Sequence, residues 1–219
     1  MNSPQRNRLE RSRSVFINCP FDSEYRPLLR AMCFTIKLCG YDPACALDFS
    51  DSSQSRFHRI VDVIVQCGMS IHDISRVELD TGSKLPRFNM PLELGADLGL
   101  RLKGPAIQRD RRILILEKDL HRYDITTSDI SGQDIEAHHN SESEIIARVR
   151  DWLNAGRQDH KPLPGADAVE KDYRTYLKIV PTIIETENLD SYERLSHKDF
   201  LWTIYAAITE IRRQRGEAP

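Results

Sequence analysis

Short, unbroken apolar runs alternate with amphipathic stretches over the first two-thirds of the chain. Such runs are typical of strands buried on both faces of a parallel sheet, and they lie at residues 14–19, 41–47, 69–74 and 112–117. Between and after them, apolar residues recur with helical spacing at residues 22–40, 52–66, 89–102 and 141–153. The pattern therefore predicts an α/β fold with a small, parallel, flavodoxin-like sheet of four or five strands and helices on both faces.

The composition changes after residue 153. Residues 154–165 contain two glycines and two prolines among charged residues, which is typical of a boundary. Helical patterns return at residues 167–187 and 196–215. The sequence thus predicts a disordered arm at residues 1–13, an α/β domain at residues 14–156 and a C-terminal helical extension at residues 166–219.

Polar residues follow the third predicted strand where it ends. Asp73 and Ser75 stand at its carboxyl end, where open α/β sheets bind ligands. The loop that follows is long for a compact domain and carries Arg76, Lys84 and Arg87. These three basic residues are candidates for contacts with nucleotide phosphates, although exposed basic residues are also common in loops.

The chain restarts as a helix at Asn89, a good capping residue. Apolar residues in steps of four predict a stripe that faces a core: Met90, Leu94, Leu98 and Leu102. Glu93 lies in the first turn, and its carboxylate is predicted to face the crevice above the strand ends. A favourable interaction with the helix dipole, about 0.3–1 kcal/mol, explains an acid at this position without any catalytic role.

The first predicted strand ends at Pro20, and Phe21 and Asp22 follow it in the turn before a helix. Backbone N–H groups at such a helix start can bind an anion, so this turn is a candidate ligand contact. A capped turn with a packed phenylalanine explains the same residues equally well. The glycine-rich fingerprint of dinucleotide-binding folds is absent from the turn.

Three motifs in order carry a family resemblance: CPFD at the end of the first strand, IHDIS in the third, and RFNMPLELG at the start of the following helix. Over residues 14–117 the chain resembles the superfamily that joins nucleoside 2-deoxyribosyltransferases to TIR-type NAD-cleaving domains, and most of all its TIR-like bacterial branch. The segment RFNMP departs from the acid- and glycine-rich approach of classical deoxyribosyltransferases. This departure argues against the transferase reaction and its deoxy specificity.

The resemblance implies roles for individual residues. Glu93, in the segment ELG, matches the glutamate that attacks the anomeric carbon of an N-glycosidic bond or stabilises cationic charge there. Asp73 is implied to hold the sugar hydroxyls or the base. The candidate substrate-binding residues are Pro20, Phe21, Asp22, Asp73, Ser75, Arg76, Asn89 and Met90.

The resemblance implies an enzyme that cleaves the N-glycosidic bond of NAD or a nucleotide, with bacterial defence or stress signalling as its setting. NAD or the nucleotide is the substrate, and no cofactor is predicted. Three alternatives remain open: a module that senses a nucleotide without turnover, a nucleoside 2-deoxyribosyltransferase, and a structural adaptor. No metal site is predicted, because His138, His139 and Asp134 lack the spacing and the further ligand that one requires.

Charge and composition limit the kinds of partner that this chain can bind. Lys+Arg of 31 against Asp+Glu of 33 gives a formal net charge of −2, which argues against binding nucleic acid through bulk positive charge. No apolar run approaches the roughly 20 residues that span a bilayer, and the amino terminus lacks a secretory signal, so we expect a cytoplasmic protein without membrane contact. The five cysteines lack CxxC spacing and are predicted to be buried thiols.

The last predicted helix carries many large apolar residues: Phe200, Leu201, Trp202, Ile204, Tyr205 and Ile208. At about 25 cal/mol per Å² of apolar surface, their joint exposure would cost several kcal/mol. The preceding helix can cover one side, but Trp202 lies on a different face from Leu201. We therefore expect a homo-oligomer built through residues 166–215.

Overall fold

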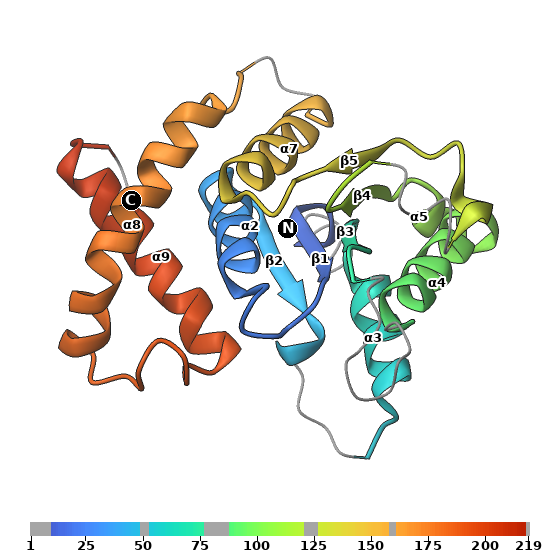
Figure 1. Ribbon diagram of the computed structural model, residues 1–219, viewed down its shortest axis with the longest axis horizontal. Coiled ribbons are helices and arrows are strands. Elements are labelled where there is room, and N and C mark those ends of the chain that lie inside the picture. The colour runs from blue at the N-terminus through green and yellow to red at the C-terminus, as the bar shows by residue number, and fades with distance from the viewer. Residues whose placement is uncertain (1–9, 49–52, 77–87, 121–126, 158–160, 218–219) are drawn as a thin grey trace, which may run out of the picture.

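The computed structural model describes residues 10–48, 53–76, 88–120, 127–157 and 161–217. Its centre is a five-stranded sheet with parallel pairings in the order β2-β1-β3-β4-β5 (Figure 1). The strands are β1 (Ser14–Asn18), β2 (Asp42–Cys45), β3 (Met69–Asp73), β4 (Arg112–Glu117) and β5 (Ile135–Ala137). This is the flavodoxin-like order, and the predicted fold class is confirmed.

Helices cover both faces of the sheet (Figure 1). They are α2 (Arg26–Leu38), α3 (Arg56–Gln66), α4 (Asn89–Lys103), α5 (Ala106–Arg109), α7 (Glu142–Ala155), α8 (Ala166–Thr186) and α9 (His197–Gln214), with short 3-10 turns η1 (Ala46–Asp48) and η2 (Ser128–Ile130). Successive strand residues point to opposite faces, so Val15 and Ile17 join the core with α2 and α7 while Phe16 packs with α3. Met90 and Leu94 of α4 form a smaller core on the α3 side.

Helix α4 differs from its prediction at three points, the first being that Glu93 lies beyond the first turn, which contains no acidic residue. Its N-cap is Phe88, which makes no side-chain cap bond, so Asn89 is the first helical residue and is exposed. The predicted apolar stripe holds for Met90 and Leu94, which are buried, but Leu102 is 70% exposed. At 3.6 residues per turn, each step of four advances the stripe by about 40°, so its last member has rotated away from the core.

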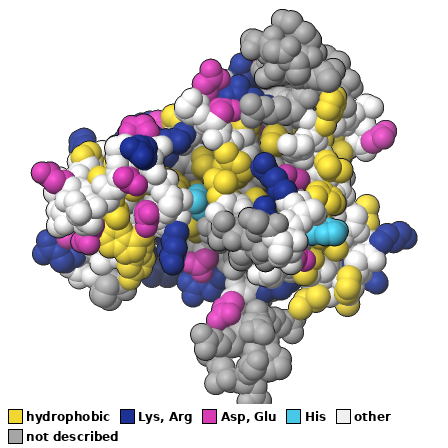
Figure 2. Space-filling view, turned by 90° about the horizontal axis from the view of Figure 1, so that it is seen from below, with side chains coloured by type: hydrophobic (Ala, Val, Ile, Leu, Met, Phe, Trp, Pro, Cys, Tyr) yellow, Lys and Arg dark blue, Asp and Glu magenta, His cyan; other side chains and the backbone are white. Residues whose placement is uncertain are grey.

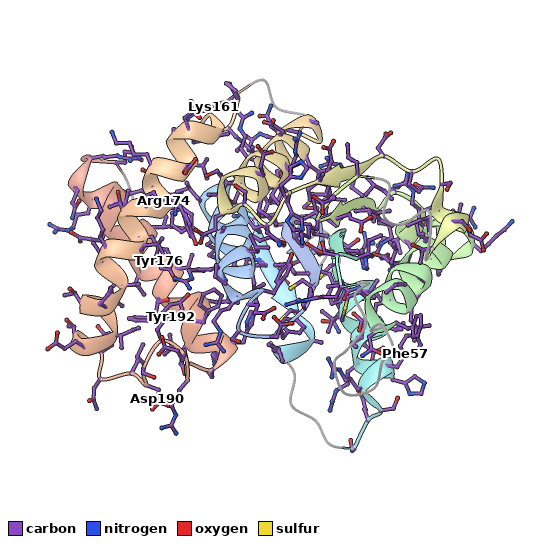
Figure 3. All side chains as sticks on the ribbon, in the orientation of Figure 1. Phe57, Lys161, Arg174, Tyr176, Asp190 and Tyr192 are labelled. Carbon is purple, nitrogen blue, oxygen red and sulfur yellow. The ribbon has the colours of Figure 1, made fainter. Side chains whose placement is uncertain are left out.

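The C-terminal helices α8 and α9 pack on each other and on α2. Phe34 of α2 is fully buried, and its ring stacks on Tyr176 of α8 with centroids 5.3 Å apart. The Arg30 guanidinium lies 4.3 Å from the ring centre of Tyr192, on the segment between α8 and α9 (Figure 3). The extension therefore covers the outer side of α2.

Much of the apolar face of α9 is covered within the chain. Ile204 and Ile208 are buried, whereas Trp202 and Tyr205 are 40% and 56% exposed. The homo-oligomer through residues 166–215 stays a prediction.

The described end of the N-terminal arm makes ordered contacts. The carbonyl of Arg11 accepts the N–H of Gly68 at 2.8 Å, and its guanidinium donates to Gln108 at 2.9 Å. The Arg13 guanidinium donates to the carbonyl of Gly40 at 2.9 Å. These contacts differ from the disorder predicted for the end of the arm, whose residues 1–9 lie outside the described residues.

All five cysteines are buried free thiols, as predicted. In the described part of the chain, no helix combines the length and the apolar character that crossing a bilayer requires.

Candidate functional site

Four buried polar side chains meet at the carboxyl edge of the sheet, and we call them the carboxyl-edge cluster: Tyr25, Asp73, Ser75 and His138. Asp73 ends β3 and accepts hydrogen bonds from the Tyr25 hydroxyl and, at 2.9 Å, from the Ser75 backbone N–H. His138 follows β5, and its Nε2 lies 3.0 Å from Asp73 Oδ2 and 2.9 Å from Ser75 Oγ. Burial and the Asp73 carboxylate raise the pKa of Tyr25 well above its usual value, so this hydroxyl remains a donor.

The cluster contains a serine, a histidine and an aspartate, but its geometry is not that of a hydrolase triad. The Asn140 backbone N–H donates to His138 Nδ1 at 3.1 Å, so in the neutral ring the proton sits on Nε2. A triad requires an unprotonated Nε2 facing the serine and a protonated Nδ1 facing the carboxylate. Here Ser75 and Asp73 both face Nε2. The cluster therefore positions the strand ends and does not activate Ser75.

A cavity of about 430 Å³ opens beside this cluster. It is lined from the carboxyl ends of β3 and β4 and from the first turns of α2 and α7, by residues that include Glu24, Tyr25, Ser75, Arg76, Lys118 and Asn140. Arg76 is held by ion pairs with Asp22 at 2.8 Å and with Glu24 at 3.0 Å. Its cation thus lies at the edge where ligands bind in open α/β sheets.

Two further cavities differ in character. One of about 100 Å³ lies between the turn after β1 and the extension, and its lining includes Phe21, Asp22, Tyr192 and Phe200. A larger one, about 710 Å³, lies beside Gly68 at the amino edge of the sheet, away from the strand ends that bind ligands in this fold.

Glu93 occupies the buried face of α4, on the side of the sheet that also carries α3. Only 6% of its surface is exposed. Burial raises its pKa to about 7, an effect that the Arg56 guanidinium opposes. The α4 helix follows β3 and packs against both β1 and β3, the two strands between which the order reverses. A carboxyl group that titrates near neutral pH at such a switch point is a candidate for catalysis.

A chain of buried hydrogen bonds fixes the start of α4. Asn18, at the end of β1, donates from its side-chain amide to the Met90 carbonyl at 3.0 Å and to Nδ1 of His72 at 3.0 Å. His72 Nδ1 accepts, so Nε2 carries the proton and donates to Asp97 at 2.9 Å. Asp97 lies one turn beyond Glu93 on the same buried face. The network thus attaches both ends of this face to the sheet.

Asp97 also pairs with a buried cation. Its second oxygen contacts Arg111 Nε, and both side chains are fully buried. Arg111 donates further to Gln108 at 2.7 Å and to the Ile64 carbonyl at 2.9 Å. Ser70 donates its hydroxyl to Asp97. A buried ion pair with this many partners holds α4, β3 and the end of α3 in one arrangement.

The predicted site residues separate into two groups. Asp22, Asp73, Ser75 and Arg76 come together at the carboxyl-edge cluster and its cavity. The remaining candidates Asn89, Met90 and Glu93 lie on the α4 side, and none of the three lines a cavity described above. In the turn after β1, Pro20 is buried and Phe21 borders the 100 Å³ cavity. Lys84 and Arg87 lie outside the described residues.

Sequence reasoning missed three polar residues of this region. Asn18 and Tyr25 flank the predicted turn of Pro20 to Asp22, and His138 is not among the predicted substrate-binding residues. Two of them could have been found from their position at the carboxyl end of a strand, because Asn18 ends β1 and His138 directly follows β5. Tyr25 carries no such signal. Among the described residues, no group of three His, Cys, Asp or Glu side chains is placed to hold a metal ion.

Comparisons with known proteins add no assignment: no protein-family model, curated protein or solved structure matches this chain.

Proposed function

We propose that this protein cleaves the N-glycosidic bond of NAD or a nucleotide, and that Glu93 acts on the sugar. The observation that carries the proposal is the Glu93 carboxyl group, buried at the β1–β3 switch point with its pKa raised to about 7. Such a carboxylate is poorly solvated, so a cation that develops beside it gains a strong electrostatic interaction.

The proposed reaction breaks the bond between the anomeric carbon and the base nitrogen. The base leaves with the bonding electron pair, and positive charge develops on the sugar ring. The Glu93 carboxylate either stabilises that charge or forms an ester with the anomeric carbon. Water then supplies a hydroxyl group to the carbon and a proton to the surroundings, which completes hydrolysis.

The surrounding residues have supporting roles in this proposal. Asn18 holds the first turn of α4 through Met90, which orients Glu93. Arg76 and Lys118, which line the 430 Å³ cavity, would bind phosphate. Asp73 is fully buried and engaged by its neighbours in the carboxyl-edge cluster, so we assign it to positioning Ser75 instead of touching ribose.

The direct test is incubation of purified protein with NAD, nucleotides and deoxynucleosides, followed by chromatography of the products. We expect a free base and a sugar product from the wild type. Glu93→Gln should lose at least about 100-fold in rate, the scale of removing one electrostatic stabiliser. Asp62→Asn, an exposed carboxylate on α3, serves as the charge-matched control and should retain full activity. Equal rates for Glu93→Gln and wild type would overturn the role of Glu93.

One observation favours a second candidate, a nucleotide sensor without turnover. The turn that would contact ligand also contacts the extension, because Arg26 donates to the Glu193 carbonyl at 2.8 Å and Phe21 shares a cavity with Tyr192. Ligand at this turn would therefore change the packing of α8 and α9. Calorimetry separates the two candidates: binding of a nucleotide that stays intact over hours supports the sensor, and product formation supports the enzyme.

Exchange of bases between deoxynucleosides, in the absence of hydrolysis, would instead favour the 2-deoxyribosyltransferase reaction.

A further inference from the structure

Helix α4 has a second apolar face, opposite the one that carries Glu93. Three of its large side chains are mostly in solvent: Phe88 is 62% exposed, Leu92 58% and Leu102 70%. Ile107 on the adjoining α5 is 52% exposed. Hydrophobic side chains reach the surface at the end of the molecule formed by α3, α4 and α5 (Figure 2). We call the outer face of α4 the α4 seam, made of Phe88, Leu92, Gly95, Gly99 and Leu102.

The α4 seam lacks the charge that a surface helix normally presents to water. Before its last turn, which carries Arg101 and Lys103, the helix has two charged side chains, Glu93 and Asp97, and both are buried on the inner face. An apolar face of this length on a helix is normally covered by another element or another chain. The exposed seam and Ile107 offer on the order of 500 Å² of apolar surface, a large share of the roughly 800 Å² that each partner buries in a standard interface.

Within the described residues, neither glycine of the seam packs against another segment. A Cβ added at Gly95 or Gly99 would meet no heavy atom within 4 Å, and neither residue has a positive φ. Glycine weakens a helix interior relative to alanine, so two of them one turn apart need a reason. Close approach of another helix is such a reason, because glycine lets the two backbones come near each other.

We propose that the α4 seam binds the same seam of a second copy of this chain, with the two helices antiparallel. The positions are symmetric about residue 97: Leu92 faces Leu102 of the partner subunit, and Gly95 faces Gly99 of the partner subunit. An antiparallel pair also sets the helix dipoles in favourable opposition. A surface with this self-complementary order fits an isologous dimer.

This dimer joins the two copies through the helix that bears Glu93. The inner face of α4 is fixed by Asn18 and Arg111, and the outer face is fixed by the partner. The proposal stands independently of the reaction, because it rests on the outer face alone.

Sedimentation of the full-length protein from about 1 to 100 μM tests the interface. The α4 seam takes the place of the interface expected through residues 166–215, so we expect a dimer for the wild type and monomers for Leu92→Glu and Leu102→Glu, whose exposed side chains leave the fold intact. Leu47→Glu, 51% exposed at η1, is the matched control and should remain dimeric. A wild-type monomer throughout this range overturns the proposal. So does a dimer that survives both seam variants, or one lost only in Tyr205→Glu on α9.

Cysteine pairing tests the register. Residues 92 and 102 lie about 15 Å apart along the helix axis, so in the antiparallel dimer neither single variant brings two new thiols together. Leu92→Cys combined with Leu102→Cys should form an intermolecular disulfide, while each single variant should not. Efficient pairing of Leu92→Cys alone would overturn the antiparallel order.

Alanine at the glycines gives a second signature. Gly95→Ala with Gly99→Ala should raise the thermal midpoint of the monomeric Leu92→Glu protein yet weaken dimerisation of the otherwise wild-type chain. If the two alanines raised both the thermal midpoint of the monomer and the affinity of the dimer, the proposed close approach of the helices would be contradicted.

Discussion

The side-chain amide of Asn18 donates a hydrogen bond to the backbone carbonyl of Met90, 3.0 Å away, and so joins the end of β1 to the first turn of α4. The same amide nitrogen contacts His72. Glu93 lies three residues beyond Met90, so a residue at the end of β1 helps to hold the start of the helix that carries Glu93.

Replacing Asn18 tests this link. Asn18→Ala leaves the His72 nitrogen and one Met90 acceptor without their buried donor, and it should lower the free energy of unfolding by about 1–3 kcal/mol. If the bond orients Glu93, kcat should also fall while KM changes little. Urea unfolding and steady-state kinetics measure the two effects, with exposed Gln66→Ala as control. An unchanged kcat in a folded Asn18→Ala protein would contradict the positioning role.

The Asp97–Arg111 pair should dominate the stability of this side of the sheet. Asp97→Ala leaves a fully buried guanidinium without its counter-ion and should cost about 3–5 kcal/mol, whereas exposed Asp129→Ala should cost under about 0.5 kcal/mol. The double variant Asp97→Leu with Arg111→Met should be less destabilised than Asp97→Ala, because no charge remains buried. Chemical unfolding decides this, and a loss below about 1 kcal/mol for Asp97→Ala would refute it.

The raised pKa of Glu93 predicts how activity depends on pH. A group that stabilises positive charge must be ionised, and the Glu93 pKa of about 7 means that the ionised fraction grows as pH rises through neutrality. We expect kcat/KM to increase about tenfold per pH unit below 7 and to level off above it. A profile that is already flat from pH 5 upward would show that Glu93 does not control the rate.

The same pKa predicts a pH window for stability. Below the usual value of 4.5 both the folded and unfolded states hold the proton, and between 4.5 and about 7 only the folded state does. The wild type therefore loses stability as pH rises through this window. Glu93→Gln cannot ionise, so it should match the wild type at pH 4 and exceed it by up to about 3 kcal/mol at pH 8. Thermal unfolding at both pH values measures the difference, and equal midpoints at pH 8 would contradict it.

Arg76 should distinguish phosphorylated substrates from nucleosides. Its guanidinium is held by Asp22 and Glu24 beside the 430 Å³ cavity. Arg76→Ala should raise KM for NAD or a nucleotide by about tenfold, the worth of one charge-assisted contact, and leave KM for a nucleoside unchanged. Parallel kinetics on the two substrate types provide the internal control. An equal rise in KM for the phosphorylated substrate and for the nucleoside would indicate a structural effect of the substitution.

Much of the fold follows from local pattern, whereas the site depends on distant pairs. The apolar runs of β1, β3 and β4 predict buried parallel strands because both of their faces are covered. The start of α4 is a local feature too, yet Phe88 takes the cap position that Asn89 was expected to occupy. One position of difference is enough to leave the Asn89 side chain in solvent.

Local sequence patterns cannot predict the polar contacts of the site, because these contacts join residues far apart in the chain. Tyr25 and Asp73 are 48 positions apart, and Ser75 and His138 are 63 apart. Their meeting depends on the rotation of α2 and on the path that leads into β5, which only three residues mark as a strand. His72 is an intermediate case: its burial follows from its apolar neighbours, but its partner Asp97 comes from the packing of α4.

The position of α2 has a consequence for synthesis of the chain. Its Phe34 is sealed on one side by the sheet core and on the other by Tyr173 and Tyr176, which the ribosome adds about 140 residues later at 5–20 residues per second. The last strand is complete at Ala137, so for roughly 2–8 seconds the nascent protein holds a complete sheet with α2 half-covered, until Tyr173 and Tyr176 are added. A cell that makes this protein must guard that surface during translation, and a premature stop near residue 165 would release a species prone to aggregate.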